Sequence, residues 1–413
     1  MKVLFVSPYL PSRRSGSPVR LRGLMTRLAR AHSLSIVALV PPAEDQEVLA
    51  DVRSYCDEVV TIPNDRFGPP SPRKRAFQLR SLLSPHSSFR LVHHRPEFQA
   101  ALDQLIGRKS YDVLQVENCF MTHYAFPREL PVVVDEHNVD YEILARTAAV
   151  VRAGPRKLYN RIDSEKLRVE EERCWRTVDA CAVTSPHDES VVREAAPNAR
   201  VAIVPNSVDT EYFAPSAAPA DRDTVLFFGT LSYYPNTDGL HFFVRQVLPL
   251  LRRSHPSVRV VIVGRDPPPA LTRESAPDIT WTGEVPDVRP YLQRARVAIA
   301  PLRIGGGTRL KILEAMAMGR AVVSTRVGAE GIGVTHERDV LLADEPQDFA
   351  AQIGRVLDDD DLASRLGTQA RRLVESDYEW STSARTLEAL QRAAVSARAP
   401  RPETLAARLS SAS

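Results

Sequence analysis

Short runs of apolar and β-branched residues alternate along the chain with longer segments in which apolar positions have helical spacing. The runs that predict buried strands in the first half are 3–6, 35–40, 59–62, 113–116, 132–135, 180–184 and 201–204. The helical segments between them are 17–31, 96–106, 157–177 and 186–195. This alternation predicts a parallel, doubly wound sheet and therefore an α/β fold.

The strand–helix pattern is interrupted around residues 215–223, where Pro, Ser, Ala and Asp replace the periodic apolar positions, as in a linker. Strand-like runs resume at 225–228, 259–263, 279–281, 297–301, 321–324 and 340–342. We therefore predict two facing Rossmann-like domains, at 1–205 and 224–376, joined by a hinge at 206–223. A helix at 377–395 is expected to pack back on the first domain, followed by a disordered tail at 396–413. Ligands of such sheets bind at the carboxyl ends of the strands, so we expect the site in the cleft between the domains.

The composition is typical of a globular protein, because 43% of the 413 residues are hydrophobic and 25% are charged. The net charge of +3 disfavours nucleic acid as a partner, because nucleic-acid-binding proteins carry a basic excess. The four cysteines lack metal-ligand spacing and are expected to be free thiols in a reducing cytoplasm. No apolar run is long enough for a membrane helix, and the apolar stretch at the N-terminus is too short for a signal peptide. We expect a cytoplasmic protein, either soluble or bound peripherally to the inner face of the membrane.

The clearest chemical signal follows the strand predicted at 297–301. Three glycines come directly after it, at Gly305, Gly306 and Gly307, and Thr308 is placed to cap the helix that follows. Glycines let the backbone approach a ligand closely, and a helix N-terminus offers unpaired N–H groups and a positive dipole end. These residues therefore predict an anion-binding loop.

Two cations and a carboxylate belong to the same predicted helix. Arg309 and Lys311 oppose the helix dipole at its N-terminus, and an anionic ligand would reverse that unfavourable interaction. Glu314 lies three residues after Lys311 on the same face, where a carboxylate can accept hydrogen bonds from a ribose diol. The plainer alternative is a surface ion pair between Lys311 and Glu314 beside a tight turn.

With these residues in view, the C-terminal half resembles the retaining glycosyltransferases of family 4, which have the GT-B fold of two facing Rossmann-like domains. The resemblance rests on Gly-Gly-Gly-Thr-Arg-Leu-Lys-Ile-Leu-Glu-Ala-Met-Ala-Met-Gly at 305–319. Further motifs in the right order and spacing lie at 204–209 with Phe213, 227–231, 261–264, 281–285, 322–325 and 328–331. The resemblance implies transfer of a sugar, with retention, from a nucleoside-diphosphate sugar to a hydroxyl acceptor. Exopolysaccharide, glycolipid and other glycoconjugate biosynthesis are the pathways that it allows.

The resemblance also implies roles for single residues of the second domain. Glu314 matches the second Glu of the family's Glu-x7-Glu motif, which holds the donor ribose. Arg309 and Lys311 stand where a basic pair would neutralise the donor diphosphate. The backbone around Val285 matches the stretch that meets the nucleobase.

In the first domain, Gly16 matches a loop position that lies against the donor phosphate, and His137 matches a histidine that approaches the transferred sugar. An ordinary strand-to-helix turn and a structural histidine are the alternatives for these two residues. The polar residues around His137 are open as acceptor-binding or structural partners: Asp135, Glu136, Asn138 and Glu142.

The chain departs from the family pattern at two places. Gly306 stands where the first Glu of the motif should be, and the Gly-Arg…Lys-Gly pair after the first strand of the second domain is replaced by a segment that begins with Gly229 and Thr230. We infer that Arg309 and Lys311 compensate for the missing cations. The predicted catalytic residues are His137, Arg309 and Lys311. The predicted donor-binding residues are Gly16, Gly229, Thr230, Val285, Gly305, Gly306, Gly307, Thr308 and Glu314.

Gly306 supports a second hypothesis from another class, a non-catalytic GT-B-like partner or regulator that binds nucleotide sugars. A dinucleotide-dependent oxidoreductase is disfavoured because no Gly-x-Gly-x-x-Gly follows a predicted strand. No Asp-x-Asp metal motif is recognisable, so we expect no metal and no other cofactor.

The acceptor is expected to be a carbohydrate, a lipid-linked sugar or a small molecule. Residues 66–95 contain seven Arg or Lys residues, no acid, and interleaved Phe and Leu. Such a segment suits an anionic membrane surface or a lipid-diphosphate acceptor. A solvated connection, or basic side chains packed around a domain edge, is the equal alternative.

Overall fold

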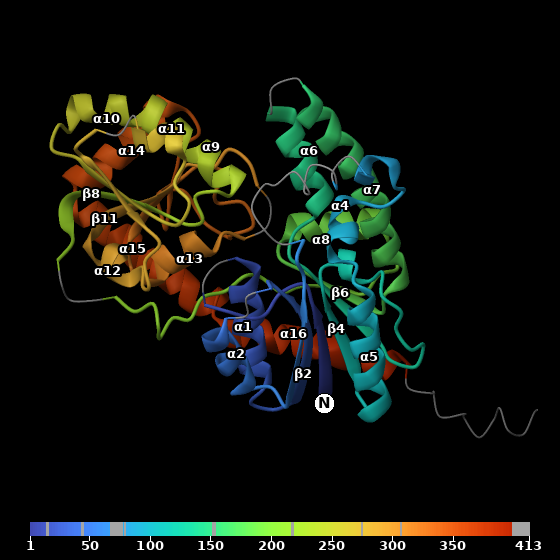
Figure 1. Ribbon diagram of the computed structural model, residues 1–413. Coiled ribbons are helices and arrows are strands. Elements are labelled where there is room, and N and C mark those ends of the chain that lie inside the picture. Colours follow the sequence, from blue (N-terminus) through green and yellow to red (C-terminus); the bar gives the residue numbers. More distant parts are fainter. Residues whose placement is uncertain are drawn as a thin grey trace, which may run out of the picture.

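The structure is a computed structural model, and it describes residues 1–13, 16–42, 45–66, 77, 80–150, 154–215, 219–273, 276–305 and 308–398. Two α/β domains face each other, and the last helix returns to the first domain (Figure 1). Two of the predicted donor-binding glycines, Gly306 and Gly307, lie outside the described residues, as does the tail beyond residue 398.

The N-terminal domain is built on a seven-stranded sheet of order β3-β2-β1-β4-β5-β6-β7, in which every neighbouring pair is parallel. Its strands are β1 (Lys2–Ser7), β2 (Ser33–Val40), β3 (Glu58–Pro63), β4 (Val113–Glu117), β5 (Val132–Glu136), β6 (Ala180–Val183) and β7 (Val201–Ile203). Its helices are α1 (Ser17–Leu28), α2 (Gln46–Arg53), α4 (Ser88–His93), α5 (Pro96–Arg108), the short η1 (Cys119–Met121), α6 (Asp140–Val150), α7 (Pro155–Thr177) and α8 (Pro186–Ala195). The order of the strands reverses between β1 and β4, which makes this the switch point of the sheet.

The C-terminal domain has a six-stranded parallel sheet of order β10-β9-β8-β11-β12-β13, with its switch point between β8 and β11. Its strands are β8 (Asp221–Phe228), β9 (Arg259–Val263), β10 (Ile279–Gly283), β11 (Ala295–Ala300), β12 (Ala321–Ser324) and β13 (Leu341–Leu342). Its helices are α9 (Tyr234–Phe242), the π-helix η2 (Phe243–Val247), α10 (Leu248–Ser254), α11 (Pro269–Arg273), α12 (Arg289–Arg294), α13 (Leu310–Ala317), α14 (Pro346–Asp358) and α15 (Asp360–Asp377). The α/β class predicted from the alternating pattern is confirmed.

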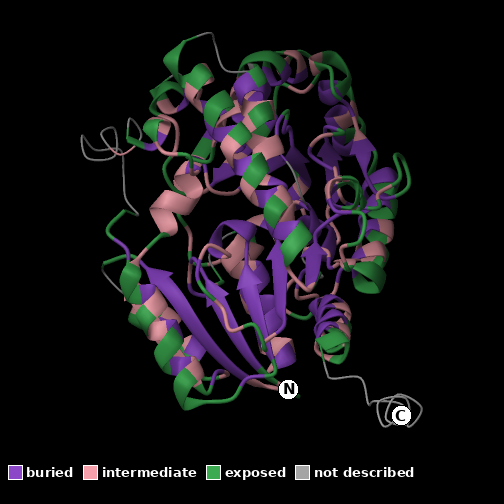
Figure 2. Cartoon of the chain, turned by 90° about the vertical axis from the view of Figure 1, so that its right-hand side faces the viewer, coloured by how far each residue is buried: buried purple, intermediate pink, exposed green. Residues whose placement is uncertain are grey.

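Both sheets are covered by helices on both faces, which explains why their strands read as continuous apolar runs. On β1, Val3 and Phe5 belong to the core that also contains α1 and α16 (Trp380–Arg398), whereas Leu4 and Val6 belong to the core on the opposite face. Figure 2 shows the buried strands inside a shell of partly exposed helices. The four cysteines are buried free thiols.

The chain crosses between the domains twice, and the two crossings lie together. Val208 in the first crossing donates its N–H to Tyr378 O (2.8 Å) in the second. After that crossing, α16 packs beside α1 on one face of the N-terminal sheet (Figure 1). β8 begins at Asp221, before the predicted start of the second domain at residue 224, and residues 396–398 of the predicted tail belong to α16. The start of β8 is fixed by its pairing with β9 and β11, and local composition does not reveal that pairing.

Candidate functional site

The switch point of the C-terminal sheet brings together two of the glycines that were predicted to bind the donor. Gly229 follows β8 and Gly305 follows β11, the strands at which the order of the sheet reverses. Their φ angles of +144° and +143° are conformations that favour glycine. A Cβ on Gly305 would lie 2.5 Å from Arg309 Nη2, and one on Gly229 would lie 3.0 Å from Lys311 Nζ. Both glycines therefore make room for the two cations of α13 at the carboxyl end of the sheet.

Lys311 is half-buried near the start of α13. Its Nζ donates a 2.6 Å hydrogen bond to Asn236 Oδ1 and lies 4.3 Å from the centre of the Phe227 ring. Asn236 is held in turn by its Nδ2, which donates to Thr230 O at 2.7 Å. Burial, and then the charge of Arg309, lowers the pKa of the Lys311 ammonium to about 7. The ammonium therefore has a fixed position and changes its charge near neutral pH.

Arg309 and Glu314 complete the charged group on α13. The Arg309 Nη2 donates to Val327 O (3.4 Å), and burial lowers the pKa of the guanidinium. Burial raises the pKa of Glu314 to about 7, against the opposing effect of Lys311. No ion pair joins Lys311 to Glu314 in the described part of the chain, so the surface-pair alternative is wrong.

Thr308 does not have the capping role that its position suggested. The N-cap residue of α13 is Arg309, which forms no side-chain capping hydrogen bond. The Thr308 hydroxyl instead donates to Thr184 O (3.1 Å) in the N-terminal domain. Asn206 Nδ2, in the first crossing, donates to Thr308 O at 2.8 Å. The capping prediction was wrong because the Thr308 side chain contacts the other domain instead. The local sequence does not encode that contact.

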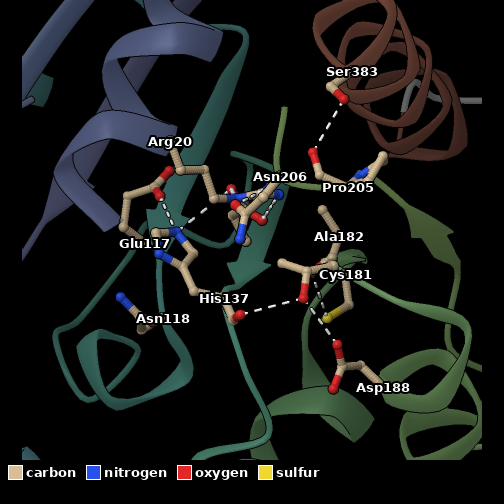
Figure 3. Close-up of polar contacts among 12 residues, drawn as sticks. Arg20, Glu117, Asn118, His137, Cys181, Ala182, Asp188, Pro205, Asn206 and Ser383 are labelled. Carbon is tan, nitrogen blue, oxygen red and sulfur yellow. Dashed lines mark hydrogen bonds and ion pairs between the residues drawn. The ribbon is translucent and has the colours of Figure 1, made fainter. Parts of the chain in front are cut away.

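On the N-terminal side, His137 follows β5 and lies among polar residues from neighbouring strands (Figure 3). It is 3% exposed, its Nε2 lies 2.7 Å from Glu117 Oε2, and its Nδ1 lies 3.0 Å from the Tyr9 hydroxyl. Burial opposes protonation of the ring, but the Asp135 and Glu117 carboxylates outweigh it and raise the pKa of His137 to about 9. The imidazole is therefore a fixed positive charge at neutral pH.

A buried ion pair supports this histidine from α1. Arg20 donates to both oxygens of Asp135, through Nε at 2.9 Å and Nη2 at 2.6 Å. Burial alone would raise the pKa of Asp135, but the charges of Arg20 and His137 outweigh it and hold that pKa well below its usual value. Sequence reasoning missed Arg20, Glu117 and Tyr9. The one signal for Arg20 was a charged residue among apolar neighbours on the inner face of a predicted helix.

Two hydrogen-bond routes connect the His137 group to the loop before α13. The Thr184 hydroxyl donates to His137 O (3.3 Å), and Thr184 O accepts from Thr308. Arg20 donates to Asn206 Oδ1 (3.2 Å), and Asn206 donates to Thr308 O. The predicted residues of the two domains therefore belong to one network.

Helix α6 provides a further contact between the domains. Arg146 Nη1 donates to Gly305 O and to Glu330 Oε2, both at 2.8 Å. The other predicted residues are less closely connected. Gly16 (φ +58°) is the N-cap residue of α1, and Val285 follows β10 and packs against the C-terminal core.

The described part of the basic segment is largely tied to the domain edge. Arg66 donates to His94 O (3.1 Å), and Arg95 forms an ion pair with Asp65 (2.9 Å). These contacts agree with the packing alternative for those two cations, while residues 67–76, 78 and 79 of the segment lie outside the described residues. Nearby, Leu83 is 90% exposed. None of the described helices is long and apolar enough to cross a bilayer.

With this geometry in place, comparison with known proteins gives a class for the C-terminal domain. Residues 222–359 match the family model for Glycosyl transferases group 1. The D-inositol 3-phosphate glycosyltransferase of Corynebacterium urealyticum is 24% identical over 311 residues, which cover 68% of this chain and 72% of the relative. The chain spans only 36% and 41% of the length of two other curated relatives.

Solved structures resemble the whole chain. Sucrose-phosphate synthase from Thermosynechococcus elongatus has a TM-score of 0.69 at 20% identity, covering 96% of this chain and 99% of that one. Anabaena HepE in complex with UDP and glucose has a TM-score of 0.66 at 15% identity, covering 94% and 98%. At these identities the likeness shows the fold alone. The predicted GT-B arrangement of two Rossmann-like domains is thereby confirmed.

Proposed function

We propose that this protein is a retaining glycosyltransferase, which moves a sugar from a nucleoside-diphosphate sugar to a hydroxyl acceptor. The observation that carries the proposal is the pair of cations at the start of α13, to which Gly229 and Gly305 give access at the switch point of the sheet. The family match over residues 222–359 supports the same reaction class. HepE, a structural neighbour, has been solved with UDP and glucose.

In this proposal, Arg309, Lys311 and the N-terminal N–H groups of α13 hold the donor diphosphate, and Glu314 accepts hydrogen bonds from the ribose. Negative charge grows on the diphosphate as the sugar–phosphate bond breaks, and fixed cations stabilise that charge better than water does. The charged His137 lies on the side of the sugar. The departing phosphate accepts the proton of the attacking hydroxyl on the same face, so configuration is retained. Closure of the domains excludes water from the donor.

Several finer expectations go with the proposal. The transfer step uses no metal or other cofactor, and the protein acts in the cytoplasm on a carbohydrate, lipid-linked or small-molecule acceptor. Contact with the inner face of the membrane through residues 66–95 is tested by flotation with vesicles that contain anionic lipid. A protein that floats with anionic vesicles but not with neutral vesicles would support a charge-dependent contact. A protein that floats with neither kind of vesicle would exclude the contact.

Donor binding is tested by calorimetry with UDP and then with a panel of nucleoside diphosphates. Arg309→Ala and Glu314→Ala are each expected to weaken binding about 10- to 100-fold, the effect of losing hydrogen bonds to a charged group. Arg303→Ala is the matched control, because Arg303 lies in the same loop but is partly exposed and pairs with Asp238 on the surface (2.7 Å). Equal affinity in all three variants and the native protein would refute the site.

Catalysis is tested with nucleotide sugars and an acceptor panel, with mass analysis of products and NMR assignment of the anomeric configuration. Transfer with retention is the expected result. Binding that depends on Arg309 without any turnover would instead support the non-catalytic nucleotide-sugar-binding hypothesis. Turnover with inversion would refute the proposed route for the proton.

A further inference from the structure

Three carboxylates that the proposed reaction does not use meet next to His137. Glu136 is the last residue of β5, Asp140 is the first residue of α6, and Glu171 lies within α7. An oxygen of each carboxylate lies within 4.8 Å of oxygens of the other two. Glu136 is fully buried, Glu171 is 1% exposed, and Asp140 is half-buried. The cluster is therefore inside the protein, with one member that solvent reaches.

The hydrogen bonds within this cluster are incomplete. Glu171 accepts the backbone N–H groups of Asp140 (3.0 Å) and Tyr141 (3.3 Å), and thereby holds the first turn of α6. Glu136 Oε2 accepts from Trp175 Nε1 at 3.4 Å. Glu136 Oε1 is buried and no described residue forms a hydrogen bond with it, although the Cys119 thiol lies near enough to lower the pKa of this carboxyl slightly. An oxygen of this kind requires an explanation, because buried polar atoms in folded proteins are almost always satisfied.

The neighbouring acidic group differs from this cluster because positive side chains pair with its carboxylates. Glu117 and Asp135 also lie close together, but Arg20 donates to both oxygens of Asp135, and His137 contacts both residues. Positive side chains therefore neutralise that group from within. In the cluster of Glu136, Asp140 and Glu171, no described Lys or Arg forms an ion pair with any of the three carboxylates. The charged His137 lowers the pKa of Glu136 and of Asp140 from nearby, but it forms no ion pair with any of the three.

We propose that Glu136, Asp140 and Glu171 bind a hard divalent cation of the Mg²⁺, Mn²⁺ or Ca²⁺ class. Carboxylate oxygens without nitrogen or sulfur ligands favour such ions, and water completes their coordination where a site is open to solvent. The orphan oxygen of Glu136 then has a partner, and the half-buried Asp140 gives the ion its path of entry. The proposal does not depend on glycosyl transfer, because the ion has a positioning role outside the transfer step.

The position of the cluster gives the ion a structural consequence. The ion would join the end of β5, the first turn of α6 and the C-terminal half of α7. Helix α6 carries Arg146, whose Nη1 contacts Gly305 O in the other domain. Binding of the ion would therefore fix the helix that touches the loop before α13, and removal of the ion would loosen that contact.

Protons are the competing explanation. Burial raises the pKa of Glu136 to about 8 and that of Asp140 to about 7, so protonation also lowers the charge of the cluster. The two explanations differ in what they predict for a chelator-treated protein. A proton-sharing cluster binds no ion, whereas a cation site takes up one ion per chain.

Terbium luminescence is a direct test, because Tb³⁺ substitutes for Ca²⁺ and becomes luminescent when a nearby Trp absorbs light. Trp175, which donates to Glu136, and Tyr141, which adjoins Asp140, are the built-in sensitisers. The native protein, dialysed against chelator, is titrated with Tb³⁺, and Ca²⁺, Mg²⁺ and Mn²⁺ are then added as separate competitors. We expect one saturable site, displaced by at least one of these ions, and higher thermal stability in the presence of the displacing ion.

Glu136→Gln is expected to weaken Tb³⁺ binding about tenfold or more, with Asp140→Asn as a second variant should the first fail to fold. Glu165→Gln is the matched control on α7, where the side chain is 69% exposed and pairs with Arg168, and it should bind like the native protein. Absence of sensitised luminescence in the native protein, or equal binding by native protein and both cluster variants, would overturn the proposal. Ion-independent stability that changes with pH in the native protein but not in Glu136→Gln would assign the cluster to protons and would likewise overturn it.

Discussion

Arg20→Met tests the buried ion pair that supports His137. Arg20 is 1% exposed and Asp135 is 0% exposed, and two hydrogen bonds of 2.9 and 2.6 Å join them. Met retains most of the apolar volume but leaves the Asp135 carboxylate buried without its main counter-charge. Removing one partner of such a pair costs about 3–5 kcal/mol. We therefore expect Arg20→Met to lower the free energy of unfolding of the N-terminal domain by about that amount.

The same helix provides a control with the same chemistry and different burial. Arg22 also donates to both oxygens of a carboxylate, that of Asp51, at 2.7 and 2.8 Å. The two side chains are 16% and 31% exposed. Water then screens the charges and solvates the carboxylate that remains, so Arg22→Met should cost no more than about 1 kcal/mol. The difference between the two variants isolates burial as the cause.

The measurement is urea unfolding followed by far-UV circular dichroism and by tryptophan fluorescence, to which Trp175 and Trp380 contribute as buried residues of the N-terminal core. For an m-value of about 3 kcal/mol per molar urea, Arg20→Met lowers the midpoint by about 1–2 M, and Arg22→Met lowers it by about 0.3 M or less. Arg20→Met combined with Asp135→Leu should recover part of the loss, because no unpaired Asp135 carboxylate remains and His137 keeps its contact with Glu117. An equal cost for Arg20→Met and Arg22→Met, or no recovery in the double variant, would refute the reasoning.

Three further predictions concern the donor side and the thiols. Affinity for UDP should fall by up to about tenfold per pH unit above pH 7, because the pKa of Lys311 is about 7 and only its ammonium form neutralises a diphosphate. Calorimetry across pH should show a flatter dependence in Lys311→Arg, and a flat profile in the native protein would contradict the assignment. Gly229→Ala should cost about 1–3 kcal/mol of stability and weaken UDP binding, because the residue has φ +144° and the new Cβ would lie 3.0 Å from Lys311 Nζ. Gly107→Ala is the control, because its Cβ would meet no described residue within 4 Å, and comparable losses in both variants would remove the steric argument. The four buried cysteines should react with a thiol reagent only slowly in the native protein and fully in denaturant; rapid native labelling would contradict their burial.

The alternation of apolar runs was enough to predict the two sheets, because a strand covered on both faces must be apolar along its length. It located β1 and β11 to within two residues of their observed ends. The glycine-rich loop and the cations of α13 were also local features, since a helix N-terminus and its nearest side chains lie within a few residues of one another. Sequence alone therefore determined the fold class and the donor-side candidates.

Contacts between distant segments required the tertiary structure. Arg20 and Asp135 are 115 positions apart, and Thr308 meets Thr184 across 124 positions. No local pattern encodes such pairs, because they form only when parallel strands bring their carboxyl ends to one edge and the two domains face each other. The capping prediction for Thr308 failed for that reason, and Glu136 and Glu171 gave no sequence signal of a shared site. The sequence determined which residues could carry charge at the ends of the strands, and the packing of β5, α6 and α7 decided which of those charges meet.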